Sequence, residues 1–163
     1  MKQVQVLVNI ADQQLSVVDQ QQRTVYQTTV ATAKNGIGQI EGSECTPLGS
    51  HRIRAKIGDD CKLNTVFVGR RPSGEIYSPE LDAQFPKRDW ILTRILWLCG
   101  NEVGINRGAN VDTMRRYIYI HGAPDSHPMG VPSSHGCIKM RNADVLALYE
   151  LVDVGTTVMI KNE

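Results

Sequence analysis

The sequence lacks long apolar runs and an excess of charge of either sign. Its longest uninterrupted apolar runs have five residues, as in 95–99, whereas about 18 are needed to span a bilayer, so a transmembrane segment is excluded. Residues 1–10 also lack the block of about 7 to 15 apolar residues that a secretory signal requires, which predicts a cytoplasmic protein. The 18 basic and 17 acidic residues give a net charge of +1, and this balance argues against a nucleic-acid partner.

Paired cysteines are missing as well. The cysteines are Cys45, Cys61, Cys99 and Cys137, and no two of them have the C-x-x-C spacing of a zinc ribbon or a dithiol motif. A chain of 163 residues can bury a sizeable core without disulfides, so we expect free thiols. Cys99 ends an apolar stretch and is expected in the core, whereas Cys45 and Cys61 lie in polar stretches.

The composition that remains is that of one globular domain over residues 1–163, with 41% hydrophobic residues. Alternation of apolar and polar residues, as in Val4, Val6, Val8 and Ile10, is typical of half-buried strands. Strands are expected over 3–10, 14–18, 24–32, 50–57, 65–68, 91–99, 117–120 and 156–160. We therefore predict a mostly β domain with a minor α part, a sandwich or partly closed barrel whose first strands form an antiparallel meander.

Helices and loops separate these strands. The one confident helix is 143–152, where apolar residues recur at helical spacing and Asn142 precedes them as the expected N-cap. A short helix is expected around 112–116, and the glycine-bearing stretch 33–49 is expected to be an ordered loop. Residues 70–90 are polar and contain three prolines, which predicts an irregular lid or binding loop.

The chemistry is concentrated between residues 117 and 144, where three of the four histidines accompany Cys137. A cysteine attacks a carbonyl as its thiolate, so it needs a neighbouring base, and His121 at the end of an expected strand can supply one. The amides of His135, Gly136 and Cys137 can form an oxyanion hole, because Gly136 has no side chain to block them.

This segment resembles the active-site signature of the YkuD-type L,D-transpeptidase family. The matching elements are His121-Gly122, then Ser134-His135-Gly136-Cys137-Ile138-Lys139, then Asn142-Ala143-Asp144. Upstream, Thr46-Pro47-Leu48-Gly49 resembles the Thr-Pro-x-Gly element of the family, and residues 154–158 resemble its closing strand. The resemblance thus runs through nearly the whole chain and implies the L,D-transpeptidase fold.

The resemblance also implies residue roles. Cys137 would be the nucleophile and His121 the base, with the main chain of Gly122 orienting the imidazole. Ser134, His135 and Gly136 would shape the oxyanion site. Lys139, Arg141 and Asn142 are the candidates for binding substrate, whose carboxylates need cationic or hydrogen-bonding partners.

Three features depart from the family pattern. Lys139 stands where arginine is usual and lacks the bidentate fork that grips a carboxylate. The 12-residue loop 122–133 is short for the family, and His51 stands where an aromatic residue is more frequent. None of the three removes the nucleophile or the base.

The substrate implied by the resemblance is the peptidoglycan stem tetrapeptide L-Ala, γ-D-Glu, diaminopimelate, D-Ala. Attack of Cys137 on the diaminopimelate carbonyl would expel D-Ala and leave a thioester. With no export signal seen, we expect hydrolysis by a cytosolic L,D-carboxypeptidase in muropeptide recycling. The alternatives are an exported L,D-transpeptidase that forms cross-links or exchanges D-amino acids, and a non-catalytic module that binds stem peptides. Carbapenem-type β-lactams are expected to acylate Cys137.

No metal or other cofactor is predicted. A zinc site would have to recruit His121, His127, His135 and Cys137, and it would consume the thiolate that the motif is expected to expose for catalysis. His127 is instead expected to be a solvated loop residue. Most arginines, among them Arg70 and Arg116, are expected on the solvated surface.

Overall fold

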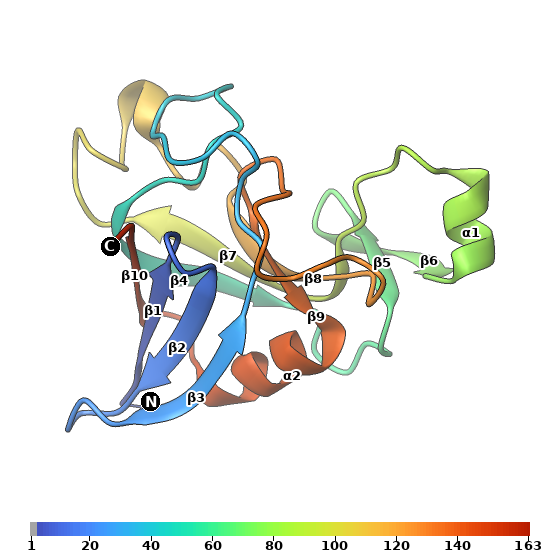
Figure 1. Ribbon diagram of the computed structural model, residues 1–163, viewed down its shortest axis with the longest axis horizontal. Coiled ribbons are helices and arrows are strands. Elements are labelled where there is room, and N and C mark those ends of the chain that lie inside the picture. The colour runs from blue at the N-terminus through green and yellow to red at the C-terminus, as the bar shows by residue number, and fades with distance from the viewer. Residues whose placement is uncertain (1–2) are drawn as a thin grey trace.

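A computed structural model describes residues 3–163, and its strands form a single curled sheet with one main helix packed on it (Figure 1). The main path through the sheet runs β3-β2-β1-β10-β4-β7-β5-β6, while β8 pairs with β7 and β9 pairs with β8. The sheet curls into a half-barrel, which confirms the prediction of a mostly β fold of the partly closed barrel type. No helix within residues 3–163 is long and apolar enough to cross a bilayer.

The N-terminal meander forms as predicted. Strands β1 (Gln5–Asn9), β2 (Gln14–Val18) and β3 (Thr24–Thr29) pair antiparallel, and β10 (Thr157–Lys161) pairs parallel with β1. The third strand is shorter than the predicted 24–32. Beyond Thr29 the chain leaves β2, and Ala31 exchanges backbone hydrogen bonds with Lys139, which brings the following loop to the active-site segment.

The centre of the sheet consists of β4 (Gly49–Ile57), β7 (Leu92–Gly100), β8 (Tyr119–Ala123) and β9 (Ile138–Arg141). Almost every residue of β7 is buried, because helix and sheet residues cover it on both sides. Strands β8 and β9 pair parallel, with Ile120 opposite Ile138. These two strands carry the active-site signature.

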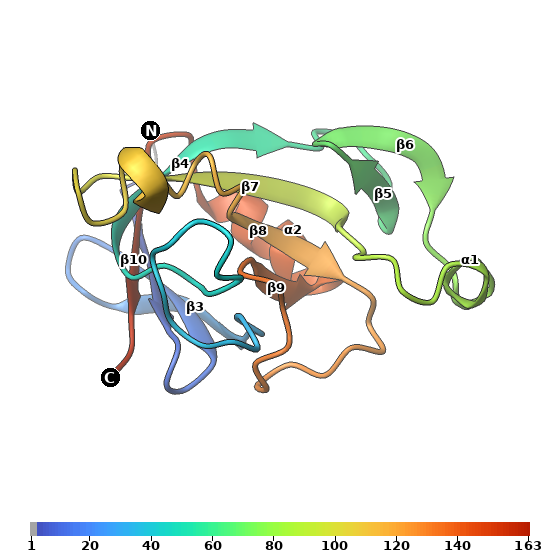
Figure 2. The same ribbon diagram turned by 90° about the horizontal axis from the view of Figure 1, so that it is seen from above.

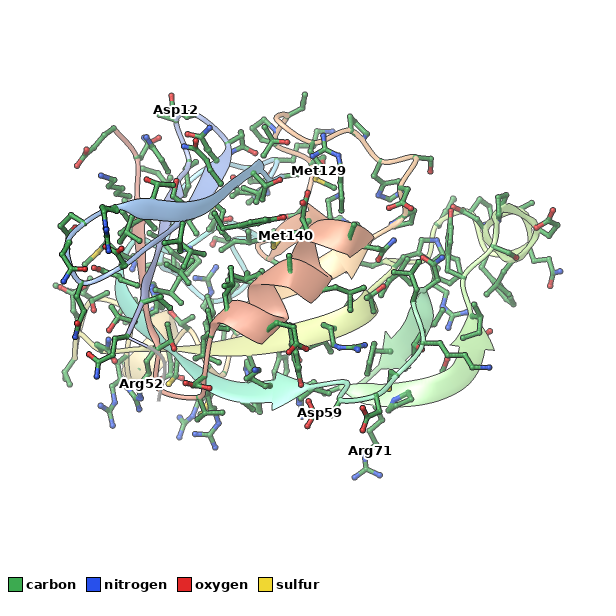
Figure 3. The ribbon with its side chains drawn as sticks, turned by 90° about the horizontal axis from the view of Figure 1, so that it is seen from below. Asp12, Arg52, Asp59, Arg71, Met129 and Met140 are labelled. Atoms are coloured by element: carbon green, nitrogen blue, oxygen red, sulfur yellow. The ribbon has the colours of Figure 1, made fainter. Side chains whose placement is uncertain are left out.

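The helix after the signature is α2 (Asn142–Leu151), which lies against β7, β8 and β9 (Figure 3). Its Val145 and Leu148 pack in the main hydrophobic core with Met140 from β9. The helix confirms the prediction, but its first residue is Asn142, so the predicted N-cap role of Asn142 is wrong. Arg141 occupies the N-cap position without a side-chain hydrogen bond, and the side chain of Asn142 points to other partners.

The segment 70–90 corrects the expectation of an irregular loop. It contains β6 (Arg71–Ile76), which pairs with β5 (Thr65–Val68), and a short helix α1 (Pro79–Gln84). Ser78 caps α1 by accepting the amide of Leu81. Figures 1 and 2 show this part projecting from one end of the sheet. Trp90 and Tyr77, in T-shaped contact with centroids 5.1 Å apart, anchor it to the body of the protein.

The segment between β7 and β8 also differs from the expectation. Its only regular element is the 3-10 helix η1 (Ala109–Val111), followed by turns instead of a helix over 112–116. Tyr117 adopts a left-handed conformation with φ of 56°, so β8 starts at Tyr119 instead of residue 117. His51 fastens this segment to β4, since its Nε2 lies 3.0 Å from the Thr113 hydroxyl.

Candidate active site

Cys137 lies immediately before β9, with its side chain partly exposed. The Tyr119 amide donates a hydrogen bond to Sγ (3.3 Å), and the thiol donates to the Tyr117 carbonyl oxygen (3.4 Å). The side chain packs against a small apolar cluster of Phe67, Ile95 and Tyr119. Burial raises the pKa of the Cys137 thiol to about 12, so the resting residue is a thiol and not a thiolate.

His121 is fully buried in β8. Its Nδ1 lies 2.8 Å from the carbonyl oxygen of Gly122. A carbonyl oxygen only accepts, so Nδ1 carries the proton and Nε2 keeps its lone pair. Burial lowers the pKa of His121, although the Gly122 carbonyl opposes the shift, and the imidazole is therefore a neutral base near pH 7. The contact predicted between His121 and the main chain of Gly122 is present.

Strand register brings the thiol and the imidazole to one face of the sheet. Ile120 is opposite Ile138, so in this parallel pair His121 and Cys137 lie on the same side, on diagonally adjacent positions. Ile120 and Ile138 point to the other side, into the main core. The thiol hydrogen-bonds the backbone of Tyr117 and Tyr119 in this structure, so transfer of its proton to His121 requires the Cys137 side chain to turn toward the imidazole.

The Cys137 loop is fixed by side chains on both sides. The Ser134 hydroxyl donates to the carbonyl oxygen of Cys137 (2.5 Å) and accepts the amide of Gly136 (3.2 Å). The hydroxyl of Thr46 donates to the Gly136 carbonyl oxygen (2.9 Å), which shows what the upstream Thr-Pro-x-Gly element contributes. Because Ser134 occupies the Gly136 amide, that amide is not free for the predicted oxyanion role in this structure.

Positions 136 and 122 both require glycine, the first because of its backbone conformation and the second because of close packing. Gly136 has φ of +127°, where a side chain is strained. A Cβ on Gly122 would lie 2.5 Å from the carbonyl oxygen of Leu92 and 2.6 Å from Oδ1 of Asn142. The close approach at Gly122 lets the strand carrying His121 pack directly on the side chain of Asn142.

Asn142 is the centre of a buried hydrogen-bond network. Its Nδ2 donates to the carbonyl oxygen of Ala123 (3.0 Å) and to the side chains of Asn64 and Asp125, while Oδ1 accepts the Thr93 hydroxyl (2.5 Å). Asn142 is buried and holds the end of β8 through the Ala123 carbonyl oxygen, while its predicted role in substrate binding stays a prediction. Sequence alone did not indicate its partners, because they come from three distant segments.

Thr93 adds an unusual backbone to this network. It has φ of 74°, a left-handed conformation that is rare for a β-branched residue, and it lies at a register shift between β7 and β8. Such a conformation costs about 1–3 kcal/mol and persists where the surroundings hold it. Here the hydroxyl of Thr93 bonds Asn142, so the strained position directly supports the strand that carries His121.

The other predicted site residues occupy different environments. Lys139 is buried beside the site, and burial lowers its pKa while the charge of Asp89 opposes the shift. Arg141 is exposed; it donates to the Thr29 hydroxyl (2.9 Å) and lies 3.6 Å from Asp144, so it belongs to the surface beside β3. The side chain of His135 is 68% exposed, with Nδ1 3.8 Å from Glu44.

Arg116 is a site residue that the sequence did not indicate. It is half-buried rather than solvated, and its guanidinium donates to the carbonyl oxygens of Cys45 (2.7 Å) and Gly38 (3.2 Å). Its positive charge favours the thiolate of Cys137, opposing the effect of burial on the pKa. No sequence signal separates Arg116 from other arginines, since its proximity to Cys137 comes from the turns of 113–117.

Two cavities lie on either side of His135. One, of about 170 Å³, is lined by Lys139, His127 and residues of the 82–90 segment. The other, of about 270 Å³, is lined by Arg116, Tyr117 and Glu44. No group of three or more histidine, cysteine or acidic side chains in residues 3–163 is arranged to hold a metal ion, so the zinc alternative has no ligand set in this part of the chain.

The geometry and the sequence agree with a known family. Residues 3–160 match the L,D-transpeptidase catalytic domain family (YkuD). The chain belongs to this family. A stretch of 48 residues is 42% identical to the probable L,D-transpeptidase YbiS of Escherichia coli (strain K12), covering 29% of this chain and 16% of that relative.

Solved structures, L,D-transpeptidases among them, share the fold. Bd1075 of Bdellovibrio bacteriovorus superposes with a TM-score of 0.61 at 15% identity, covering 99% of this chain and 48% of that one. L,D-transpeptidase 3 of Mycobacterium tuberculosis, in complex with a faropenem-derived adduct, gives a TM-score of 0.60 at 16% identity, covering 99% and 61%. The chain thus spans about half of these structures and a smaller part of YbiS.

Proposed function

We propose that the chain is a cysteine acyl-transfer enzyme that cleaves the diaminopimelate–D-Ala bond of peptidoglycan stem tetrapeptides. The observation that carries the proposal is the strand register, which places Cys137 and a neutral His121 on the same side of the sheet at diagonally adjacent positions. Membership of the L,D-transpeptidase family supports the substrate class. Lys139 and Arg116 supply positive charge for a substrate that carries several carboxylates.

The reaction follows from the protonation states. Sγ of Cys137 attacks the diaminopimelate carbonyl while its proton passes to Nε2 of His121. His121 then gives this proton to the departing amine of D-Ala, which leaves a thioester. Water adds to the thioester with His121 as base, and the products are the tripeptide, D-Ala and the free thiol. Because the thiol is protonated at rest, its proton moves as the carbon–sulfur bond forms.

We further propose that water is the main acceptor, which makes the enzyme an L,D-carboxypeptidase. In the predicted cytoplasmic setting, the thioester meets water and soluble muropeptides and no sacculus to cross-link, which favours hydrolysis. The cytoplasmic setting in muropeptide recycling stays a prediction, for which cell fractionation is the test.

Mass spectrometry of the products tests the reaction. The protein is incubated with disaccharide-tetrapeptide, with and without a second tetrapeptide or a free D-amino acid in excess. Release of D-Ala to give the tripeptide under all conditions is the expected result. A cross-linked dimer or an exchanged D-amino acid would replace the hydrolytic proposal with a transpeptidase, and no change in the substrate would overturn the enzymatic proposal.

Acylation by a β-lactam provides an independent test of the nucleophile. The solved relatives include one in complex with a faropenem-derived adduct and one in complex with imipenem. We expect imipenem to add its mass to this chain at Cys137, with Cys45→Ser as a matched control that retains the adduct. Absence of the adduct from the wild-type chain would favour a module that only binds peptides.

A further inference from the structure

The cavity of about 170 Å³ beside Lys139 has unusual walls. One wall comes from the segment 82–90 and the other from the loop that precedes Cys137 and from β9. Within residues 3–163, four buried side-chain polar atoms have no hydrogen-bond partner, and three of them belong to residues lining this cavity: Nε1 of Trp90, Nδ1 of His127 and Oγ of Ser133. An unpaired buried polar group costs about 1–3 kcal/mol, so a ligand able to pair with these atoms would be favoured at this cavity.

Lys139 contributes a charge to the same cavity. The residue is only 8% exposed, and it forms no ion pair within 4 Å in the described part of the chain. Its Nζ is not among the fully buried unpaired atoms, so the ammonium stays accessible to a ligand, and a carboxylate is the partner suited to it. Trp90, Ser133 and Lys139 together offer an indole N–H, a hydroxyl and an ammonium, which is a donor set suited to a carboxylate.

The cavity also has acidic residues, which restrict the ligand. Asp82 and Asp89 both line it, and the negative charge of Asp89 acts on Lys139 and His127. Arg88 lines it too, but its guanidinium is already paired with Glu75 (2.5 Å). A purely anionic ligand would be repelled by the two aspartates. A ligand that carries a negative and a positive group can pair with Lys139 and with an aspartate at the same time. The small volume admits an end group and not a whole peptide.

We propose that this cavity binds the zwitterionic head of an α-amino acid, with its carboxylate at Lys139, Trp90 and Ser133 and its ammonium toward Asp89. This inference rests on the proposed function, because it names a subsite beside the same Cys137. The head has two possible sources there: the free D-centre of the diaminopimelate side chain, or the D-amino acid that leaves. Ligand entry requires small movements of the walls, since the unpaired atoms are almost inaccessible in the empty cavity.

The two tryptophans make a direct test possible. In protein labelled with 15N-tryptophan, Trp90 and Trp97 give one indole signal each. The indole of Trp97 donates to the Met114 carbonyl oxygen (3.1 Å), so its signal is an internal control. The titration uses the Cys137→Ala variant, with Trp90→Phe for assignment. D-Alanine or meso-diaminopimelate should shift the Trp90 signal saturably and leave the Trp97 signal in place.

Variants and analogues make the test specific. Lys139→Met should weaken binding at least about 10-fold, whereas Lys87→Met, at an exposed lysine of the same cavity, should change it little. D-Alaninamide lacks the carboxylate and N-acetyl-D-alanine lacks the ammonium, so both should bind more weakly than D-alanine. If Lys139→Met disturbs folding, which the Trp97 signal reports, Ser133→Ala replaces it.

The outcomes separate the two sources and the two proposals. Tighter binding of meso-diaminopimelate assigns the cavity to the stem side chain, and tighter binding of D-alanine assigns it to the leaving amino acid. No shift at tens of millimolar of either ligand, or equal shifts of both indoles, overturns the inference. Because Cys137→Ala needs no turnover, a shift without D-Ala release by the wild type would refute only the proposed function. Release of D-Ala by the wild type without a shift of the Trp90 signal would refute only the proposed binding of an amino-acid head in this cavity.

Discussion

The two faces of β8 and β9 differ in what they contact, although they belong to the same short strands. Ile120 and Ile138 are fully buried among aliphatic side chains and α2. His121, the next residue of β8, and Cys137, immediately before β9, lie on the other face, with shifted pKa values and specific hydrogen-bond partners. Packing of the apolar face holds the two strands in place. The opposite face can therefore keep a base and a nucleophile in fixed positions.

The comparison predicts that substitutions on the polar face change activity, whereas those on the apolar face change stability. Cys137→Ala should show the largest effect, a loss of about 10⁴-fold or more in D-Ala release, because no thioester forms. Its melting temperature should stay close to that of the wild type. Turnover measured by mass spectrometry and thermal unfolding decide it, and retained turnover would contradict the assignment of the nucleophile.

His121→Gln should come next, with a loss of about 10²–10⁴-fold in the rate of acylation by imipenem, since no base remains to accept the thiol proton. The matched control is His135→Gln, in the exposed loop that precedes Cys137. This variant should keep most of the acylation rate. Stopped-flow or timed intact-mass measurements give the rates. Equal losses of acylation rate in both variants would contradict the assignment of His121 as the base.

The pH dependence sharpens the comparison further. Burial lowers the pKa of His121 and raises that of Cys137 to about 12. The acylation rate should therefore be flat between about pH 6.5 and 8.5 and should fall only when the pH drops below the usual range of a histidine, as His121 becomes protonated. A rate that instead rises through pH 8.5, as for an ordinary cysteine, would show that the thiolate forms without His121.

Asn142→Ala tests the support between the two faces. It removes the acceptor of the Thr93 hydroxyl proton and a donor to the Ala123 carbonyl oxygen, which should cost about 1–3 kcal/mol of stability. Misplacement of β8 should also lower kcat about 10-fold with little change in KM. Chemical unfolding and steady-state kinetics measure both. A change in KM alone would restore Asn142 to the substrate-binding role suggested by the sequence.

Ile120→Val should give the smallest effect. It removes one buried methylene from the apolar face and should cost about 0.5–1.5 kcal/mol of stability, with kcat within about twofold of the wild type. Denaturant unfolding and D-Ala release are the measurements. A large loss of kcat at unchanged stability would contradict the separation of the two faces.

Local patterns in the sequence predicted much of the fold. The alternation in β1 and β2 and the helical spacing in α2 were sufficient because each follows from which side of the element is buried. Ser78-Pro79, a capping serine followed by a proline, is a start signal for helix α1. The three prolines of 70–90 nevertheless favoured the prediction of an irregular loop. Asparagine is common at helix N-caps, but the side chain of Asn142 instead hydrogen-bonds residues that are distant in the sequence, such as Ala123.

The sequence by itself determined the mostly β class, through strand periodicity, and the L,D-transpeptidase family, through its motif. The motif also indicated Cys137 and His121 as the residues to test. Only the tertiary structure decided that Asn142 supports β8, that Arg116 lies near the thiol and that Trp90 and Lys139 line one cavity. Those contacts join segments tens of residues apart. They depend on strand register and chain packing, which no local pattern encodes.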